Sequence, residues 1–492
     1  MIASRRVVAL AGVAVLATVA LRVPRSPAAA GAAVRPPSAL AWRPCSQGVA
    51  DCTRLRVPVD YAEPEGPTIS LALTRVKARL PKQRIGTLFV NPGGPGAPGV
   101  EFAQLLGRIL SPRVTERFDI IGFDPRGVAS SAPIRCTDGP TLDRLQHIDP
   151  SPDDQREIDD LQSAARELAA DCARTSPTML PHVGTPDVAR DIDQIRAALG
   201  ETKISYLGFS YGTLLGLTYA QLFPTRLRAY VLDGVLDPAV SLDERNREQA
   251  IGFDRNLAAF LADCAKRIAC TFHHGGNPRA AFDALMARVD ASPLPVGKRS
   301  LGPAEFTAAI VSQLYNTQRG WPGLAHLLAA AERGNGRPAL DRFDNYVDRR
   351  PNGTYDNTNE ANLAVNCLDL PASRDPAHIV SEATKVAADA PVFGAAAVWY
   401  NAPCTYWAVA SPGLDPRAPV GAPPVLLVGN TNDPATPYLW AQSVAQRVPE
   451  SMLLTYAHDG HTAYLSGPPC IKNAIDAYLV TLTPVPASTV CR

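Results

Sequence analysis

Short apolar, β-prone runs alternate with helix-like segments near both ends of this chain. The clearest runs are residues 86–90, 118–123, 204–209, 424–429 and 452–456. Nearly uninterrupted apolar runs of this length are typical of strands buried on both faces of a parallel sheet. Because helical patterns fall between them, the sequence predicts an α/β fold with a mostly parallel central sheet and helices on both faces.

The middle of the chain has a different pattern. Between residues 238 and 417 the strand signal fades, and helical periodicity dominates at 246–268, 280–289, 305–314 and 324–333. The chain has 492 residues, which is more than one hydrophobic core normally supports. We therefore predict an α/β domain built from residues 41–237 and 418–492, with a mainly helical domain inserted at 238–417.

The N-terminus has the pattern of an export signal. Arg5 and Arg6 precede an apolar stretch, Val7–Leu21, and small residues follow it at Ala28–Ala30. This stretch is short for a membrane span, which needs about 20 apolar residues. We expect residues 1–33 to be a Sec-type signal peptide, with a retained anchor as the alternative. The mature protein would then be secreted or held in the cell envelope, without stable membrane insertion.

The ten cysteines agree with export, because disulfides persist in oxidising compartments. None of them forms a Cys-x-x-Cys pair, which argues against a zinc site or a thioredoxin-like motif. Spacing alone does not determine which cysteines pair. Sequential pairing is the simplest hypothesis, with bonds Cys45–Cys52, Cys136–Cys172, Cys264–Cys270, Cys367–Cys404 and Cys470–Cys491.

Charge argues against one large class of partner. The chain carries 48 lysines and arginines against 47 acidic residues, and it has no basic run of the kind that follows phosphates. We therefore expect no nucleic-acid partner. The histidines show no i, i+4 pair suited to a metal, and no cofactor is expected. The sequence leaves the oligomeric state open.

The run at 204–209 leads into a pattern that exposes a nucleophilic serine. Residues 208–212 read Gly-Phe-Ser-Tyr-Gly, and a helix-like segment follows at 213–223. In such a strand–turn–helix context, the sharp turn lifts the hydroxyl of Ser210 above the sheet. Short Gly/Ser patterns also occur in ordinary turns, so this interpretation depends on whether Ser210 has partners.

An acid and a histidine follow in the order that such a serine requires. Asp433 comes after the run at 424–429, and His461 comes after the run at 452–456. The chain order Ser, Asp, His is that of α/β-hydrolases. Ser210 would attack the substrate, His461 would accept and return the proton, and Asp433 would orient the imidazole.

Two alternatives to these partners stay open. His458 lies three residues before His461, although the glycine between them lets the later histidine fold back over the serine. Asp233 and Asp237 stand at another strand end, where some proteins of this fold keep the acid. The position after the penultimate strand favours Asp433.

A glycine-rich loop, Asn91–Gly96, follows the run at 86–90. Glycine lets backbone N–H groups approach a developing oxyanion closely. The loop lacks the Gly-Lys-Ser/Thr ending of a phosphate loop and the spacing of a dinucleotide-binding loop. An oxyanion loop is therefore the better interpretation.

Five motifs in this order resemble those of secreted tripeptidyl aminopeptidases of actinobacteria, in the prolyl-aminopeptidase group of serine peptidases: Asn91–Gly96, Asp124–Gly127, Gly208–Gly212, Asp433–Pro437 and Gly460–Thr462. The resemblance spans most of the mature chain. It implies an α/β-hydrolase fold with the family's C-terminal segment, and an exopeptidase that releases short peptides, tripeptides above all, from free N-termini. It also implies that Gly94 and Tyr211 supply the oxyanion N–H groups. Two places depart from the family, which usually has serine near Pro98 and glycine near Ala129.

The helical insertion lies between the serine half and the Asp/His half, where such enzymes place a cap over the active site. An aminopeptidase also needs a carboxylate to bind the cationic N-terminus. Candidates in the cap are Glu360 and Asp369, the latter close to Cys367. Arg126 is instead expected to pair with a nearby acid such as Asp124.

The same triad chemistry also acts on acyl esters. A secreted carboxylesterase or lipase is therefore the main alternative function, and a non-catalytic binding protein on the same fold is a third. A binding protein has no chemical need for Ser210, Asp433, His461 and the glycine loop together, which argues against the third.

Overall fold

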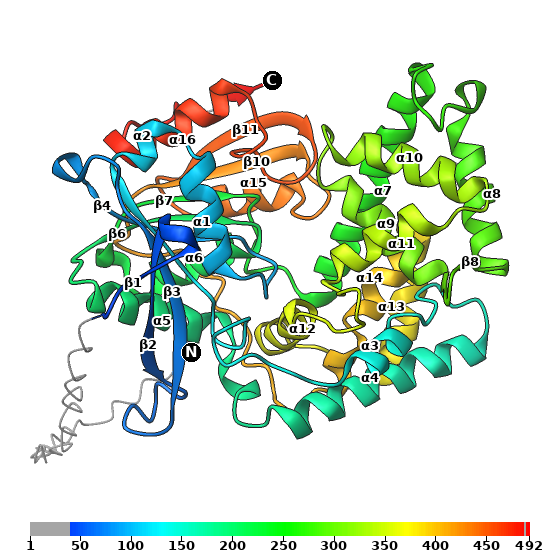
Figure 1. Cartoon of the computed structure of the whole chain (residues 1–492), viewed down its shortest axis with the longest axis horizontal. Helices are drawn as coiled ribbons and strands as arrows, with labels where there is room; N and C mark the ends of the chain where they lie inside the picture. Colours follow the sequence, from blue (N-terminus) through cyan, green and yellow to red (C-terminus); the bar gives the residue numbers. More distant parts are fainter. Residues whose placement is uncertain (1–39, 487–488) are drawn as a thin grey trace, which may run out of the picture. The chain divides into compact units, whose positions relative to one another are not determined.

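One twisted sheet forms the centre of the part of the chain that the structure describes, residues 40–486 and 489–492 of a computed structural model (Figure 1). The predicted signal peptide lies outside these residues. The sheet has ten strands in the order β1 (Arg43–Cys45), β2 (Ala50–Pro58), β3 (Thr68–Val76), β5 (Phe118–Phe123), β4 (Gly86–Asn91), β6 (Ile204–Phe209), β7 (Leu227–Asp233), β10 (Val425–Asn432), β11 (Met452–Asp459) and β12 (Val490–Cys491).

The mostly parallel arrangement predicted from the apolar runs is confirmed. All five runs are strands, and every neighbouring pair from β5 to β12 is parallel. Strands β1, β2 and β3 form an antiparallel edge that the apolar runs did not indicate. In β2 the buried and accessible positions alternate, because one face of this edge is open to solvent, so it has no continuous apolar run.

Helices cover both faces of the sheet, as the fold prediction required. On one face, α1 (Gly99–Ile109) and α16 (Pro469–Thr481) pack on side chains such as Leu88 and Leu207. On the other, α5 (Thr185–Ala198), α6 (Tyr211–Leu222) and α15 (Tyr438–Arg447) pack on Phe89 and Tyr206. Successive residues of a strand thus point into different hydrophobic cores, one on each face of the sheet. This explains why odd- and even-numbered positions of these strands are both apolar.

Between β7 and β10 the described chain is mainly helical. It forms a hairpin, β8 (Leu294–Val296) and β9 (Arg299–Leu301), and the helices α7 (Leu242–Lys266), α8 (Pro278–Ala291), α9 (Pro303–Leu314), α10 (Gly320–Glu332), α11 (Arg337–Tyr346), α12 (Thr358–Asp369), α13 (Pro376–Asp389) and α14 (Gly394–Tyr400). We call this segment, residues 238–417, the helical insertion. Many of its aromatic side chains, including Phe253 and Phe260, share one hydrophobic core.

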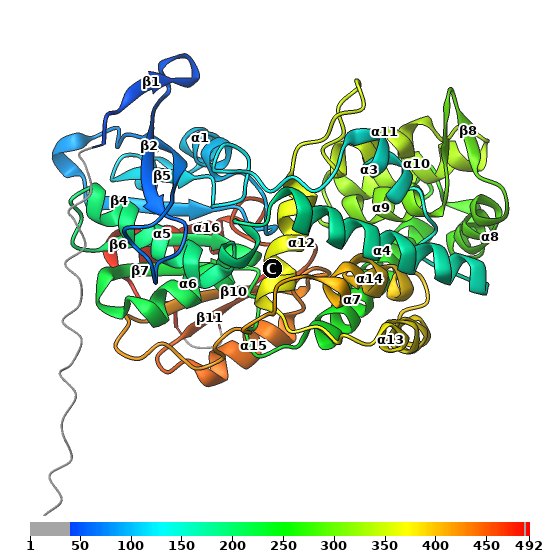
Figure 2. The same cartoon turned by 90° about the horizontal axis from the view of Figure 1, so that it is seen from below.

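Packing crosses the predicted limits of the helical insertion in two places. Helices α3 (Gly139–Leu145) and α4 (Gln155–Thr175) precede it in sequence, yet Leu142 and Leu161 join its core. Conversely, α12 packs with side chains of the α/β part, among them Tyr211 and Trp440. Figures 1 and 2 show α12 between the strands and the rest of the insertion. The division into two domains at residues 237/238 and 417/418 stays a prediction.

Two features of the described residues bear on the compartment of the protein. The ten cysteines form the five sequential disulfides that were the simplest hypothesis. This pairing fits an oxidising compartment. None of the described helices combines enough length with enough apolar residues to cross a membrane.

A buried ion pair holds the turn after β5. Arg126 is fully buried and donates to both carboxylate oxygens of Asp191 at 2.7 and 2.6 Å, and also to three backbone carbonyls. The expectation that Arg126 pairs with Asp124 is wrong, because the Asp124 carboxylate accepts hydrogen bonds from the N–H groups of Val100 and Ser130. The true partner lies on α5, 65 residues further along the chain, where sequence proximity gives no guide.

Ala129, one of the two departures from the family pattern, has an unusual backbone. Its φ of 45° lies in the left-handed region that favours glycine. Its N–H donates to the Asn357 side chain at 2.9 Å, which fixes the turn in this conformation. The residue usual in the family is therefore the one that this backbone favours.

We expect Ala129→Gly to stabilise the protein by about 0.5–1 kcal/mol, because relief of left-handed strain exceeds the added entropy of the unfolded chain. Urea unfolding monitored by circular dichroism measures this difference. The matched control is Ala284→Gly on the exposed face of α8, which should cost about 1 kcal/mol. Equal destabilisation by both changes would contradict the prediction.

Candidate active site

Ser210 occupies the sharp turn between β6 and α6. Its φ of 53° and ψ of −125° lie outside the regions that side chains normally allow, so the backbone is strained here. A Cβ on Gly208 would lie 2.3 Å from the carbonyl oxygen of Gly212, and a Cβ on Gly212 would lie 2.8 Å from the carbonyl oxygen of Asn91. Only glycine fits at both positions, which is the physical reason for the Gly-x-Ser-x-Gly pattern.

His461 and Asp433 are in direct contact. Nδ1 of His461 lies 2.9 Å from each carboxylate oxygen of Asp433, which is fully buried directly after β10. The carboxylate also accepts the N–H groups of Ala435 at 2.9 Å, Thr436 at 2.8 Å and Thr462 at 3.2 Å. Its orientation is therefore fixed from several directions. Burial by itself would lower the pKa of His461, but the negative charge and hydrogen bonding of Asp433 raise it above its ordinary value.

The alternative partners make other contacts. Nε2 of His458 lies 2.9 Å from the Thr317 hydroxyl. Asp237 pairs with Arg447. The Asp233 carboxylate accepts hydrogen bonds from the backbone N–H groups of Ala463 and Tyr464, directly after the histidine loop. The geometry thus favours His461 and Asp433 over these three residues.

The end of β7 contacts both the turn of Ser210 and the loop of His461. The N–H of Ser210 donates to the carbonyl oxygen of Asp233 at 2.9 Å. In the next residue, Gly234, a Cβ would lie only 3.0 Å from Cε1 of His461. The Asp233 carboxylate accepts the N–H groups of residues 463 and 464 at 2.9 and 2.8 Å. One strand end therefore contacts both the serine turn and the histidine loop.

The predicted oxyanion groups lie at the same corner. A Cβ on Gly93 would lie 2.5 Å from the Phe209 carbonyl oxygen and 3.1 Å from the Tyr211 nitrogen, so the glycine loop packs directly against the serine turn. The Asn91 side chain accepts the N–H of Gly93 at 2.9 Å and shapes this loop. Gly94 is exposed at its tip, and Tyr211 begins α6, where helix N–H groups are unpaired. Donation by Gly94 and Tyr211 to an oxyanion stays a prediction.

Helix α12 of the helical insertion closes the other side of the glycine loop. A Cβ on Gly96 would lie 2.3 Å from the Thr358 carbonyl oxygen, so only glycine allows this approach. The amide of Asn362 donates to the carbonyl oxygen of Pro95 at 3.0 Å. The loop is thus held between the serine turn and α12.

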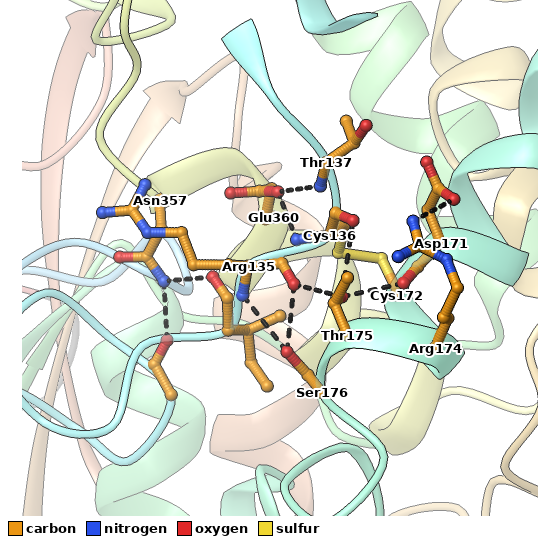
Figure 3. The surroundings of a disulfide bond; sticks show 12 residues. Arg135, Cys136, Thr137, Asp171, Cys172, Arg174, Thr175, Ser176, Asn357 and Glu360 are labelled. Carbon is orange, nitrogen blue, oxygen red and sulfur yellow. Dashed lines mark hydrogen bonds and ion pairs between the residues drawn. A yellow bond between two sulfur atoms is a disulfide. The ribbon is translucent and has the colours of Figure 1, made fainter.

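The two carboxylates predicted to bind a substrate amine are buried, and both accept hydrogen bonds from protein groups. Glu360 accepts the N–H groups of Cys136 at 2.6 Å and Thr137 at 3.2 Å, beside a disulfide (Figure 3). Asp369 accepts the N–H of Thr185 at 2.9 Å and its hydroxyl at 2.5 Å. Burial raises the pKa of Glu360, and that of Asp369 to about 6. The structure does not bring either carboxylate into contact with the predicted triad, and amine binding by them stays a prediction.

Two further residues touch His461 and were missed by the sequence analysis. Thr436 Oγ1 lies 3.3 Å from Nδ1 of His461, and its place within the Asp433–Pro437 motif could have drawn attention to it. Tyr315 follows α9 in the helical insertion. Its carbonyl oxygen accepts a hydrogen bond from the backbone N–H of His461 at 2.8 Å. The centroids of the two rings lie 5.4 Å apart in an edge-to-face arrangement. No motif or spacing signals this contact between distant parts of the chain.

Metal-binding potential lies elsewhere among the described residues. The potential ligand atoms of Asp243, His378 and Glu382 lie within 4.8 Å of one another on α7 and α13. His378 is already 2.8 Å from the Asp243 carboxylate, and Glu382 pairs with Lys385 at 3.1 Å. This group is separate from Ser210 and His461 and is accounted for as an ion-pair network.

Comparison with known proteins gives a consistent family. A profile described as the alpha/beta hydrolase fold matches residues 86–468. Serine protease Hip1 of Mycobacterium tuberculosis is 37% identical over 478 residues, 92% of this chain and 90% of that protein. Carboxylesterase B of the same species is 36% identical over 471 residues, 92% and 89% of the two chains. Tripeptidyl aminopeptidase of Streptomyces lividans is 34% identical over 440 residues, 87% and 81% of the two chains.

The raised pKa of His461 makes a prediction about pH dependence. A histidine that accepts the serine proton must be neutral, so the acid limb of kcat/KM should lie above the ordinary histidine pKa of about 6.5. Asp433→Asn removes the negative charge that stabilises the imidazolium. The limb should therefore move to lower pH, and kcat should fall by about 10⁴-fold.

Steady-state hydrolysis of a chromogenic acyl ester between pH 4 and 9 provides the measurement. His458→Gln is the matched control, because this histidine bonds to Thr317 and should leave both the rate and the limb unchanged. An acid limb that stays in place in Asp433→Asn, or that moves in His458→Gln, would overturn the assignment.

Proposed function

The chain belongs to the alpha/beta hydrolase fold family and is a serine hydrolase, and on this premise we propose that it is a secreted exopeptidase that releases tripeptides from free N-termini. The observation that supports the chemistry is the contact between Nδ1 of His461 and both carboxylate oxygens of Asp433, together with the strained backbone of Ser210. The pairing of all ten cysteines supports export.

In this proposal the reaction follows the acyl-enzyme route. The hydroxyl oxygen of Ser210 attacks the scissile carbonyl carbon while His461 accepts the hydroxyl proton. The resulting oxyanion is stabilised by the N–H groups of Gly94 and Tyr211. His461 then gives the proton to the leaving amine, and the C–N bond breaks. Water, deprotonated by His461, attacks the acyl-enzyme and releases the peptide and Ser210.

Recognition of the free amine requires an anionic partner for the substrate ammonium. Glu360 and Asp369 stay the candidates from the sequence, although each already accepts a hydrogen bond from a backbone N–H group. Burial raises the pKa of both carboxyl groups, which weakens their case as anionic partners near neutral pH. The preference for a peptidase rests mainly on the similarity to a tripeptidyl aminopeptidase and to a serine protease.

A carboxylesterase is the second candidate function. It is supported by the similarity to carboxylesterase B, whose identity to this chain is close to that of the peptidases. Both functions use the same nucleophile and base, so the triad does not distinguish them. The distinction lies in whether catalysis requires a free N-terminal amine.

We expect the purified mature protein to hydrolyse a chromogenic tripeptide amide with a free N-terminus, and to act poorly on its N-acetylated twin. Ser210→Ala should lose at least about 10⁴-fold in kcat, because the nucleophile is removed. The measurement compares kcat/KM for these two peptides and for a short acyl ester, in the wild-type protein and in Ser210→Ala.

Ser205→Ala, within the strand β6 that ends directly before the nucleophile, is the matched control and should keep its activity. Fast ester hydrolysis without preference for the free amine would replace the peptidase with the esterase. Equal activity of Ser210→Ala and the wild-type protein would refute the whole mechanism.

A further inference from the structure

Two tyrosines of the helical insertion expose their side chains although they are large and partly apolar. Tyr346 ends α11 with 41% of its surface exposed, and Tyr400 ends α14 with 51% exposed. A single exposed aromatic residue needs no explanation, but exposed aromatic groups that converge on a site commonly contact a ligand. Contacts connect each of these tyrosines with a different part of the candidate active site.

Tyr346 is connected to the histidine. Its ring centroid lies 6.4 Å from that of Tyr315, and the two hydroxyl oxygens are 3.5 Å apart. Tyr315 in turn packs edge to face on His461 and accepts its N–H at 2.8 Å. A group bound against the exposed side of the Tyr346 ring would therefore be separated from Tyr315 only by that ring, and Tyr315 packs on His461.

Tyr400 is connected to the oxyanion loop. Its hydroxyl donates to the side-chain oxygen of Asn362 at 3.2 Å. The amide of Asn362 donates to the carbonyl oxygen of Pro95 at 3.0 Å, and Pro95 directly follows Gly94. Each tyrosine is thus one residue removed from the candidate site: Tyr346 through Tyr315, and Tyr400 through Asn362.

The chemistry of this surface is aromatic and uncharged. Phenol hydroxyls have an ordinary pKa of about 10, so both tyrosines are neutral at physiological pH. Burial raises the pKa of both hydroxyls further; the Tyr346 hydroxyl lies beside that of Tyr315, and the Tyr400 hydroxyl donates to the uncharged side chain of Asn362. An apolar or aromatic side chain gains packing energy on such rings, whereas a carboxylate would lose hydration without a partner.

We propose that Tyr346 and Tyr400 are specificity-determining residues that contact an apolar or aromatic side chain of the substrate peptide, at the residue that precedes the scissile bond. This inference rests on the proposed peptidase function and names its preferred substrate class. It also gives the helical insertion a direct role at the chemistry, through the contacts of Tyr315 with His461 and of Asn362 with Pro95.

The test uses three tripeptide amides that have free N-termini and differ only in the residue before the scissile bond: phenylalanine, alanine or aspartate. The wild-type protein should favour phenylalanine over alanine by about tenfold in kcat/KM, with aspartate the poorest. Tyr346→Ala and Tyr400→Ala should each lower kcat/KM for the phenylalanine peptide several-fold more than for the alanine peptide. The phenylalanine-to-alanine ratio should therefore fall toward one.

Two further variants separate the possible causes. Tyr346→Phe and Tyr400→Phe keep the rings and should keep the ratio, which distinguishes ring contact from the hydroxyl hydrogen bonds. Ile268→Ala, which changes an 88% exposed apolar residue of the same insertion, is the matched control and should leave the ratio unchanged.

The outcomes distinguish this inference from the proposed function. If the wild-type protein cleaves free-amine peptides but the ratio is unchanged in both alanine variants, with unchanged melting temperatures, the inference is overturned and the peptidase stands. If the wild-type protein cleaves none of the three peptides while it hydrolyses an acyl ester, both are overturned. A preference for aspartate would also contradict the inference.

Discussion

The geometry of the candidate site depends on the hydrogen bonds of Asp233. Its backbone carbonyl accepts the N–H of Ser210, and its fully buried carboxylate accepts the N–H groups of Ala463 and Tyr464. A buried carboxylate is costly without such partners, and burial still raises its pKa to about 6. One residue at the end of β7 therefore fixes both the serine turn and the loop that carries His461.

Three glycines allow neighbouring segments to approach the candidate site closely. Gly93 packs against the serine turn, Gly96 admits α12, and Gly234 leaves room for the imidazole. At each position a Cβ would meet another group at 3.0 Å or less. The glycine loop therefore contacts the serine turn on one side and α12 on the other, and Gly234 contacts His461. Because α12 and Tyr315 both belong to the helical insertion, the glycine loop and His461 share contacts with the part expected to select substrates.

The buried carboxylates show why the type of a residue does not reveal its use. Glu360 and Asp369 were reasonable candidates for an amine-binding site, since both are acidic and lie on one helix of the insertion. In the structure Glu360 accepts a hydrogen bond from the backbone N–H of Cys136, and Asp369 accepts one from the backbone N–H of Thr185. These hydrogen bonds connect α12 to the part of the chain that precedes the helical insertion. Tyr346 and Tyr400, the exposed tyrosines that contact Tyr315 and Asn362, carry no signal in the sequence.

The sequence by itself determined the parallel strands and the serine turn, because each follows from a local pattern of apolar residues and glycines. It also offered the triad Ser210, Asp433 and His461 as a prediction and sequential disulfides as the simplest hypothesis, and the structure forms those disulfides. It missed the antiparallel edge, the Arg126–Asp191 pair, the role of Asp233 and the contact of Tyr315 with His461. These depend on which distant segments meet, and only the tertiary structure decides that. A buried polar group must find a partner wherever the fold supplies one, and spacing along the chain does not say where.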